Sequence, residues 1–337
     1  MSRRICVAVG VCLVIGSLFG CRNSDSDVES GNDGKGGKLD IVCTTGMVAD
    51  LVRQVVGERA EVRAIMKINI DPHLFTPTTS DVRALGKADI VFYSGLFLEG
   101  RMVDAFEKIK ESGKPIFAVA DGVDKKSLRS PSEFEGHPDP HIWMDVQLWS
   151  CCLDEVVARM VEVDSDHADE FAKNAEAYAK ELDSLHEYAK TTIASIPKDR
   201  RVMVTAHDAF GYYSLAYGIA VRSAQGITTE SEPGVNDINK LVDFLVSEKI
   251  PAIFVESSVS ADNIKALIEG AGSKGHKVNV GGELFSDAMG AAGTYRGTYL
   301  GMIDHNTTVI ALALGGTDVS AGGKDGKLAD AEATVKK

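Results

Sequence analysis

Four residues stand in sequence contexts that suit metal binding. His73 and His141 each follow the dipeptide Asp-Pro, so the motif Asp-Pro-His occurs twice, and the proline fixes the backbone just before each imidazole. His207 comes after an apolar run that we expect to be a strand, and Asp287 also follows an expected strand. Imidazole nitrogens suit zinc and manganese, and a carboxylate adds a charged oxygen. These residues therefore form a candidate metal site.

The spacing of the four residues carries little information, because they lie 68, 66 and 80 positions apart. A single loop histidine is more often a surface residue than a ligand. The prediction depends on all four lying in loops, three of them directly after apparent strands. Three histidines and one carboxylate complete a tetrahedral zinc shell, or a distorted manganese shell when the carboxylate binds through both oxygens.

The remaining histidines lack such a context, and they are His137, His167, His186, His276 and His305. His167 and His186 fall on a long helical pattern, where we expect them to be solvated. His137 lies close to His141 and could help to capture a metal ion, although an ordinary loop histidine is the simpler interpretation.

The elements that must position these residues alternate between strands and helices. Runs with the apolar character of strands cover residues 39–43, 62–66, 90–93, 115–119, 202–205, 252–255 and 277–280. Helical patterns between them include residues 47–56, 235–247 and 261–271. This alternation predicts an α/β fold in which parallel sheets are flanked by helices, with ligands at the carboxyl ends of the strands.

One segment has a different pattern and predicts a single long helix. Its apolar residues recur with spacings of 4, 3, 4, 3 and 4, and they are Phe171, Ala175, Tyr178, Leu182, Leu185 and Ala189. A coiled coil would need more heptads than this stripe provides. We therefore expect two lobes, residues 39–160 and 199–315, joined by one long helix within residues 161–198.

Both ends of the chain differ from this globular body. Residues 1–20 combine two arginines with an apolar stretch that is too short for a membrane span, which predicts a signal peptide. The stretch ends at Leu18-Phe19-Gly20-Cys21, which resembles the lipobox of bacterial lipoproteins and makes Cys21 the candidate lipidation site. Residues 21–38 predict a flexible tether, and residues 316–337 predict a polar tail.

Composition and missing motifs exclude several classes of protein. The chain of 337 residues has a formal charge of −13 and no basic cluster, so it is a poor candidate for binding nucleic acid. It has no H-E-x-x-H, G-x-S-x-G or P-loop motif. Beyond Cys21 the cysteines are Cys43, Cys151 and Cys152, and a disulfide from Cys43 to either of the others stays open.

Four segments together resemble the zinc/manganese ABC-transporter substrate-binding proteins, a TroA-like family of metal-binding lipoproteins (cluster A-I). The segments are DPHLFTP at 71–77, HPDPHIWMD at 137–145, TAHDAFGY at 205–212 together with AYG at 216–218, and GELFSD at 282–287. The resemblance covers residues 39–315 and implies a TroA-like fold of two α/β lobes joined by one rigid helix. It also implies a binding protein rather than an enzyme.

The resemblance implies that a metal ion is bound between the lobes by His73, His141, His207 and Asp287. A monomeric receptor outside the cytoplasm, periplasmic or anchored to the membrane by lipid, would then deliver the ion to an ABC permease. Three further carboxylates are candidates for orienting the imidazoles, and they are Asp145, Asp208 and Glu256.

The identity of the metal and two other functions stay open. A nitrogen-rich ligand set and the order of metal affinities favour Zn2+, with Mn2+ next. A secreted metal-dependent hydrolase would use the same ligands but keep a coordination position for water. An adhesion or interaction lipoprotein would bind a partner as well as a metal.

Overall fold

The computed structural model describes residues 38–132, 134 and 136–317, and every structural statement below refers to these residues. The predicted signal peptide, the lipidation site Cys21 and most of the predicted tether and tail lie outside them. The described residues belong to one compact unit that starts at Lys38. Among its described helices, none has both the length and the hydropathy needed to span a bilayer.

The N-terminal half, residues 39–160, contains a four-stranded parallel sheet with the strand order β2-β1-β3-β4. Its strands are β1 (Leu39–Cys43), β2 (Ala60–Ala64), β3 (Ile90–Tyr93) and β4 (Ile116–Ala118). The helices between them are α1 (Gly46–Val56), α2 (Thr79–Lys87) and α3 (Val103–Glu111). Residues 39–43 and 90–93 are strands as predicted, whereas β2 starts two residues before the predicted run.

The C-terminal half, residues 199–315, contains two parallel pairs of strands, with β5 packed beside β7. Its strands are β5 (Val202–Thr205), β6 (Ala220–Ser223), β7 (Ala252–Glu256) and β8 (Asn279–Leu284). The helices of this half include α6 (Gly211–Tyr217), α7 (Val235–Ser247) and α8 (Asp262–Ser273). The register shifts between Ile253 and Phe254, opposite a glycine pair in β8, and β8 covers residues 279–284 rather than the predicted 277–280.

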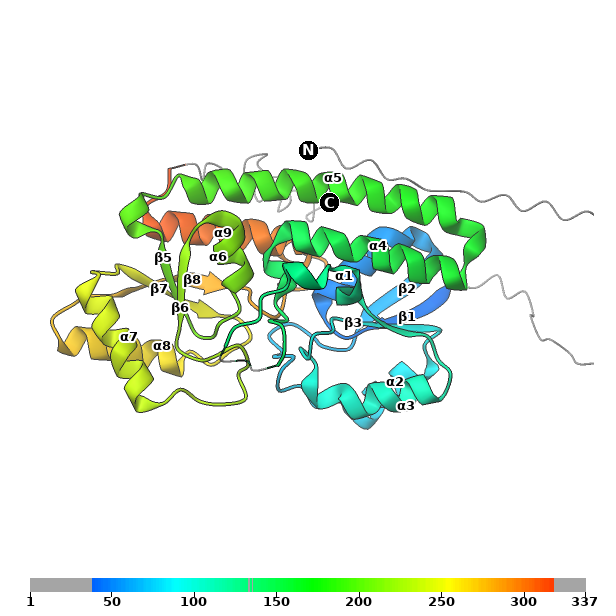
Figure 1. Cartoon of the computed structure of the whole chain (residues 1–337), viewed down its shortest axis with the longest axis horizontal. Coiled ribbons are helices and arrows are strands. Elements are labelled where there is room, and N and C mark those ends of the chain that lie inside the picture. The colour runs from blue at the N-terminus through cyan, green and yellow to red at the C-terminus, as the bar shows by residue number, and fades with distance from the viewer. Residues whose placement is uncertain (1–37, 133, 135, 318–337) are drawn as a thin grey trace, which may run out of the picture. The chain divides into compact units, whose positions relative to one another are not determined.

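Three long helices form a layer over both halves, and they are α4 (Val146–Val163), α5 (Ala168–Ala194) and α9 (Tyr299–Leu314). The longest, α5, has 27 residues and runs across the top of the view in Figure 1, above the sheets of both halves. It packs on α4, α1 and α9. All six residues of its predicted apolar stripe are buried. The predicted α/β fold with one long helix is therefore confirmed.

The expectation of solvated histidines on this helix is met only in part. His186 is only partly exposed, and its ring centroid lies 5.4 Å from that of Tyr217. His167 precedes α5 in a short 3-10 turn and is also partly buried, with Nδ1 2.7 Å from an oxygen of Asp164. The spacing of apolar residues takes no account of histidines, so it does not show which of them lie at the border of the buried face.

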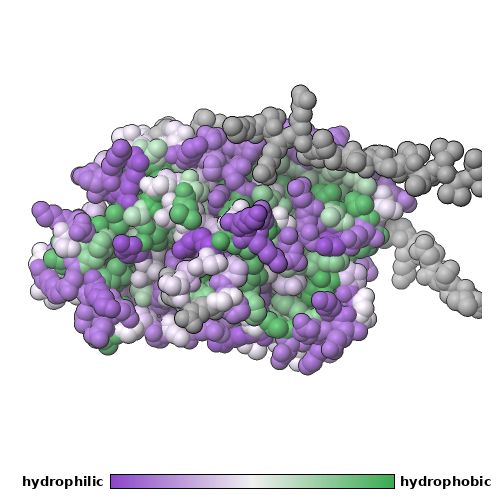
Figure 2. All heavy atoms as spheres, in the orientation of Figure 1, coloured by the Kyte–Doolittle hydropathy of each residue, from purple (hydrophilic) through white to green (hydrophobic). Residues whose placement is uncertain are grey.

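The hydrophobic core is shared between the two halves. Its largest cluster continues from α1 through α4 and α5 to α9 and includes buried residues of both halves, whereas a smaller cluster lies around α7 and α8. The thiols of Cys43 and Cys152 are buried in the larger cluster, and the described part of the chain contains no disulfide. On the face shown in Figure 2, hydrophilic residues cover most of the surface and apolar areas are small and scattered.

Candidate metal centre

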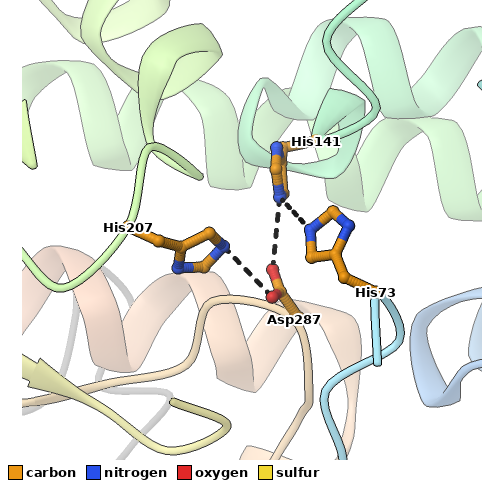
Figure 3. A group of neighbouring side chains, drawn as sticks. All are labelled: His73, His141, His207 and Asp287. Atoms are coloured by element: carbon orange, nitrogen blue, oxygen red, sulfur yellow. Dashed lines mark hydrogen bonds and ion pairs between the residues drawn. The ribbon is translucent and has the colours of Figure 1, made fainter. Parts of the chain in front are cut away.

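The four candidate ligands come from four loops that converge between the two halves. His73 lies in the loop between β2 and α2, and His141 lies just before the 3-10 turn that leads into α4. His207 follows the carboxyl end of β5, and Asp287 follows that of β8. Their side chains point toward one another in Figure 3. All four residues are buried, with at most 3% of any of them exposed.

The distances between the donor atoms suit a single ion. Nε2 of His73 lies 3.2 Å from Nε2 of His141, and the latter lies 3.5 Å from Oδ1 of Asp287. Nε2 of His207 lies 3.1 Å from Oδ2 of Asp287. One donor atom from each of the four residues falls within 4.8 Å of all the others. Donors of a tetrahedral zinc site are separated by about 3.3 Å, since zinc–nitrogen bonds are about 2.0 Å long.

In the metal-binding form of His207, which carries its only ring proton on Nδ1 toward Glu256, three buried polar atoms of the centre lack a hydrogen-bond donor. They are Nε2 of His207 and both carboxylate oxygens of Asp287. An unpartnered buried polar atom is costly, and a buried carboxylate is more costly still. A cation between these atoms would satisfy them all. The donor set of three imidazoles and one carboxylate therefore fits a divalent transition metal.

The ring of His141 is held by the aspartate two residues before it. Oδ1 of Asp139 accepts the backbone N–H of His141 at 2.9 Å and lies 2.8 Å from its Nδ1. Because an ionised carboxylate can only accept, Nδ1 carries the proton and Nε2 presents its lone pair to the centre. Arg129 forms an ion pair with the other oxygen of Asp139.

The ring of His207 is held in the same way by a glutamate at the end of β7. Oε2 of Glu256 lies 2.5 Å from Nδ1, and Oε1 accepts the backbone N–H groups of Ala206 and His207 at 2.7 and 3.0 Å. Burial alone lowers the pKa of His207, but the carboxylates of Glu256 and Asp287 outweigh it and raise that pKa well above its usual value.

His73 has a different electrostatic environment. Burial lowers the pKa of His73 to about 3; the Asp287 carboxylate opposes this effect, and the other two imidazoles add to it. The ring is therefore neutral and ready to bind a metal near neutral pH. Burial would raise the pKa of Asp287, yet the three imidazoles around it hold that pKa below its ordinary value. The centre thus keeps its carboxylate ionised.

Of the three carboxylates proposed to orient imidazoles, only Glu256 contacts a ligand. Asp145 caps the start of α4 by accepting the backbone N–H of Gln147, and Asp208 lies 3.8 Å from Arg129. Sequence reasoning missed Asp139 and Asp71, the aspartates of the two Asp-Pro-His motifs. Their signal was present, because an aspartate two residues before another residue often accepts its backbone N–H.

His137 does not join the centre. Its ring centroid lies 4.1 Å from that of Phe97, and it lines a separate pocket of about 420 Å³ beside Tyr93 and Phe106. The interpretation of His137 as an ordinary loop histidine agrees with this position.

Comparisons with known proteins give one consistent result. Residues 41–313 match the sequence model of the ZnuA family, described as "Zinc-uptake complex component A periplasmic". The chain is 42% identical over 298 residues to the manganese-binding lipoprotein MntA of Bacillus subtilis (strain 168), a match covering 88% of this chain and 95% of that protein.

A second relative is named for a different metal. The zinc-binding protein TroA of Treponema pallidum (strain Nichols) is 41% identical over 314 residues, covering 93% of this chain and 99% of that protein. The solved structure of the periplasmic zinc-binding protein TroA from Treponema pallidum matches with a TM-score of 0.80 at 42% identity, covering 82% of this chain and 99% of that one. Similarity therefore does not distinguish between zinc and manganese.

Proposed function

The chain belongs to the family of the periplasmic zinc-uptake component A, and we propose that it is an extracytoplasmic receptor that captures one divalent transition-metal ion and delivers it to an ABC permease. The observation that carries this proposal is the centre itself. Four buried donor residues converge on one point, and when His207 carries its only ring proton on Nδ1, three of their polar atoms have no hydrogen-bond donor. A bound ion would supply the missing interactions.

We propose zinc as the preferred ion. Three imidazoles make the donor set rich in nitrogen, and sites of this kind bind zinc more tightly than manganese. One observation favours manganese as the second candidate. Both oxygens of Asp287 face the other ligands, Oδ1 toward His141 and Oδ2 toward His207, so the carboxylate can bind through both. This would give a fifth donor, which suits a larger ion.

The centre supports capture of an ion better than catalysis. A catalytic metal needs an open position for water and a nearby base. Here the ligands are buried, and the neighbouring carboxylates Asp139 and Glu256 are bonded to the rings of His141 and His207. Neither of these two carboxylates is free to act as a base, so we propose a receptor and not a hydrolase.

We further propose that the two halves act as lobes around the ion, with α5 as the helix that joins them. His73 and His141 belong to the N-terminal half, and His207 and Asp287 belong to the C-terminal half. Only the closed arrangement presents all four donors, so binding of the ion stabilises that arrangement. Lipidation of Cys21 and a monomeric state complete the proposal.

The test is native mass spectrometry with elemental analysis on residues 22–337, which retain the whole compact unit that starts at Lys38. The purified protein is titrated with zinc and with manganese, separately and in competition. We expect one ion per chain and a preference for zinc. A preference for manganese would overturn the choice of metal, and the absence of any stoichiometric metal would overturn the receptor.

A further inference from the structure

The two Asp-Pro-His motifs share a bonding pattern that extends beyond the metal ligands. In each motif Oδ1 of the aspartate accepts the backbone N–H of the histidine two residues later, at 2.8 Å for His73 and 2.9 Å for His141. This bond fixes the backbone that carries the imidazole. The second oxygen, Oδ2, is left to bond with something else, and in both motifs it does.

In the first motif the second oxygen bonds across the centre to the other half of the protein. Oδ2 of Asp71 accepts a hydrogen bond from the hydroxyl of Thr229, 158 residues later in the loop after β6. Thr229 is 7% exposed, and Asp71 is partly buried. The backbone of His73 is therefore connected through one carboxylate to the C-terminal half.

In the second motif the connection passes through an arginine and a tyrosine. Oδ2 of Asp139 pairs with Arg129, whose other terminal nitrogen lies 3.8 Å from Oδ2 of Asp208. The hydroxyl of Tyr212, on α6 of the C-terminal half, accepts the backbone N–H of Arg129 and donates to the carbonyl of Asp139, both at 2.9 Å. The loop that carries His141 is thus bonded to the C-terminal half.

We propose that Thr229 and Tyr212 are positioning residues that couple closure of the two halves to the orientation of the His73 and His141 imidazoles. Each bonds a motif aspartate or its backbone only while the halves are together. Separation of the halves removes these bonds and loosens the imidazoles of the N-terminal half at the same time. The inference rests on the proposed function, and it predicts that the two residues slow the release of a bound ion.

The experiment measures zinc release from the loaded protein by mixing it with an excess of a chromogenic chelator. Thr229→Val keeps the shape of the side chain and removes the hydroxyl, and Tyr212→Phe does the same on α6. We expect each variant to release zinc about 10-fold faster, the usual size of an effect on residues that support metal ligands. The rate of zinc association should stay at the wild-type value.

Matched controls separate this role from a general effect on folding. Thr228→Val makes the same change one residue before Thr229. Tyr213 lies beside Tyr212 on α6, and Tyr213→Phe removes its buried hydrogen bond to Thr307 of α9. Both controls should release zinc at the wild-type rate. Thr229→Ser restores the hydroxyl and should restore slow release. The melting temperature of each metal-free variant is measured alongside.

Two results would contradict the inference while leaving the receptor intact. The first is a wild-type release rate in both Thr229→Val and Tyr212→Phe. The second is equally fast release from Thr228→Val and Thr229→Val, which would show that the loop responds to any change. A wild-type protein that holds no zinc or manganese would instead overturn the proposed function.

Discussion

Replacing Glu256 with glutamine should weaken zinc binding and leave the fold in place. Oε2 of Glu256 lies 2.5 Å from Nδ1 of His207, and Oε1 accepts two backbone N–H groups. Glutamine keeps the size of the side chain, and its amide oxygen can keep the backbone bonds. Its amide nitrogen then faces Nδ1 and can only donate, so the imidazole loses both its acceptor and a neighbouring negative charge.

The size of the effect follows from charge and distance. The 2.5 Å contact, the width of an imidazole ring and a zinc–nitrogen bond place the carboxylate about 6 Å from a bound ion. Two unit charges at that distance interact by about 3 kcal/mol at an effective dielectric constant of about 20. The raised pKa of His207 reflects the same attraction, because Glu256 and Asp287 favour a positive charge at this ring.

A zinc ion adds at least one unit of positive charge at this ring, so Glu256 contributes at least one net charge interaction to binding. A loss of about 3 kcal/mol corresponds to roughly 100-fold in the dissociation constant, which a competition titration against a zinc-binding dye measures. Glu283→Gln is the control, because Glu283 lies opposite Val255 on the neighbouring strand and is exposed. Zinc affinity in Glu256→Gln equal to that of the control would refute the reasoning.

Three further predictions test other parts of the structure. Asp287→Ala should weaken zinc binding by more than about 100-fold, because a ligand matters more than its supports, whereas His137→Ala should bind like the wild type in the same titration. In Gly211→Ala a Cβ would lie 1.4 Å from Nη1 of Arg129, so the guanidinium must leave its place beside Asp139 and zinc affinity should fall about 10-fold; unchanged affinity would show that the ion pair is dispensable. Leu182→Ala should lower the free energy of unfolding by about 3 kcal/mol in urea titrations and leave zinc affinity unchanged, and a marked loss of affinity would show that α5 acts on the centre directly.

Much of the fold could be predicted where local patterns and packing agree. The strands at 39–43, 90–93 and 202–205 are short apolar runs between turns, and the stripe of α5 keeps a helical period from Phe171 to Ala189. The helix α9 could not be found in this way. It is buried on several sides, including at Asp304 and Asn306, so its sequence has no polar face to give a period. The strand β6 is half exposed and carries Arg222, so it lacks an apolar run.

The candidate ligands could be predicted because each has a recognisable sequence context. Their arrangement in space could not be predicted in this way. Each candidate can be recognised separately, as a histidine after Asp-Pro or as a histidine or aspartate that follows a strand. The structure brings all four together. Their roles as ligands stay a prediction until a metal is measured. Supporting residues from the other half of the protein, such as Thr229, could not be predicted. A threonine in a loop has no distinguishing sequence pattern before the fold brings it to Asp71.

The burial of all four donors has a kinetic consequence. An external chelator cannot reach an ion whose ligands are at most 3% exposed, so the ion leaves only after the protein opens. The observed rate is then that of opening, and it is independent of chelator concentration. A stronger competitor for the metal changes how much is removed but not how quickly. A membrane partner that unloads this protein must therefore hasten its opening, and greater affinity for the ion would not suffice.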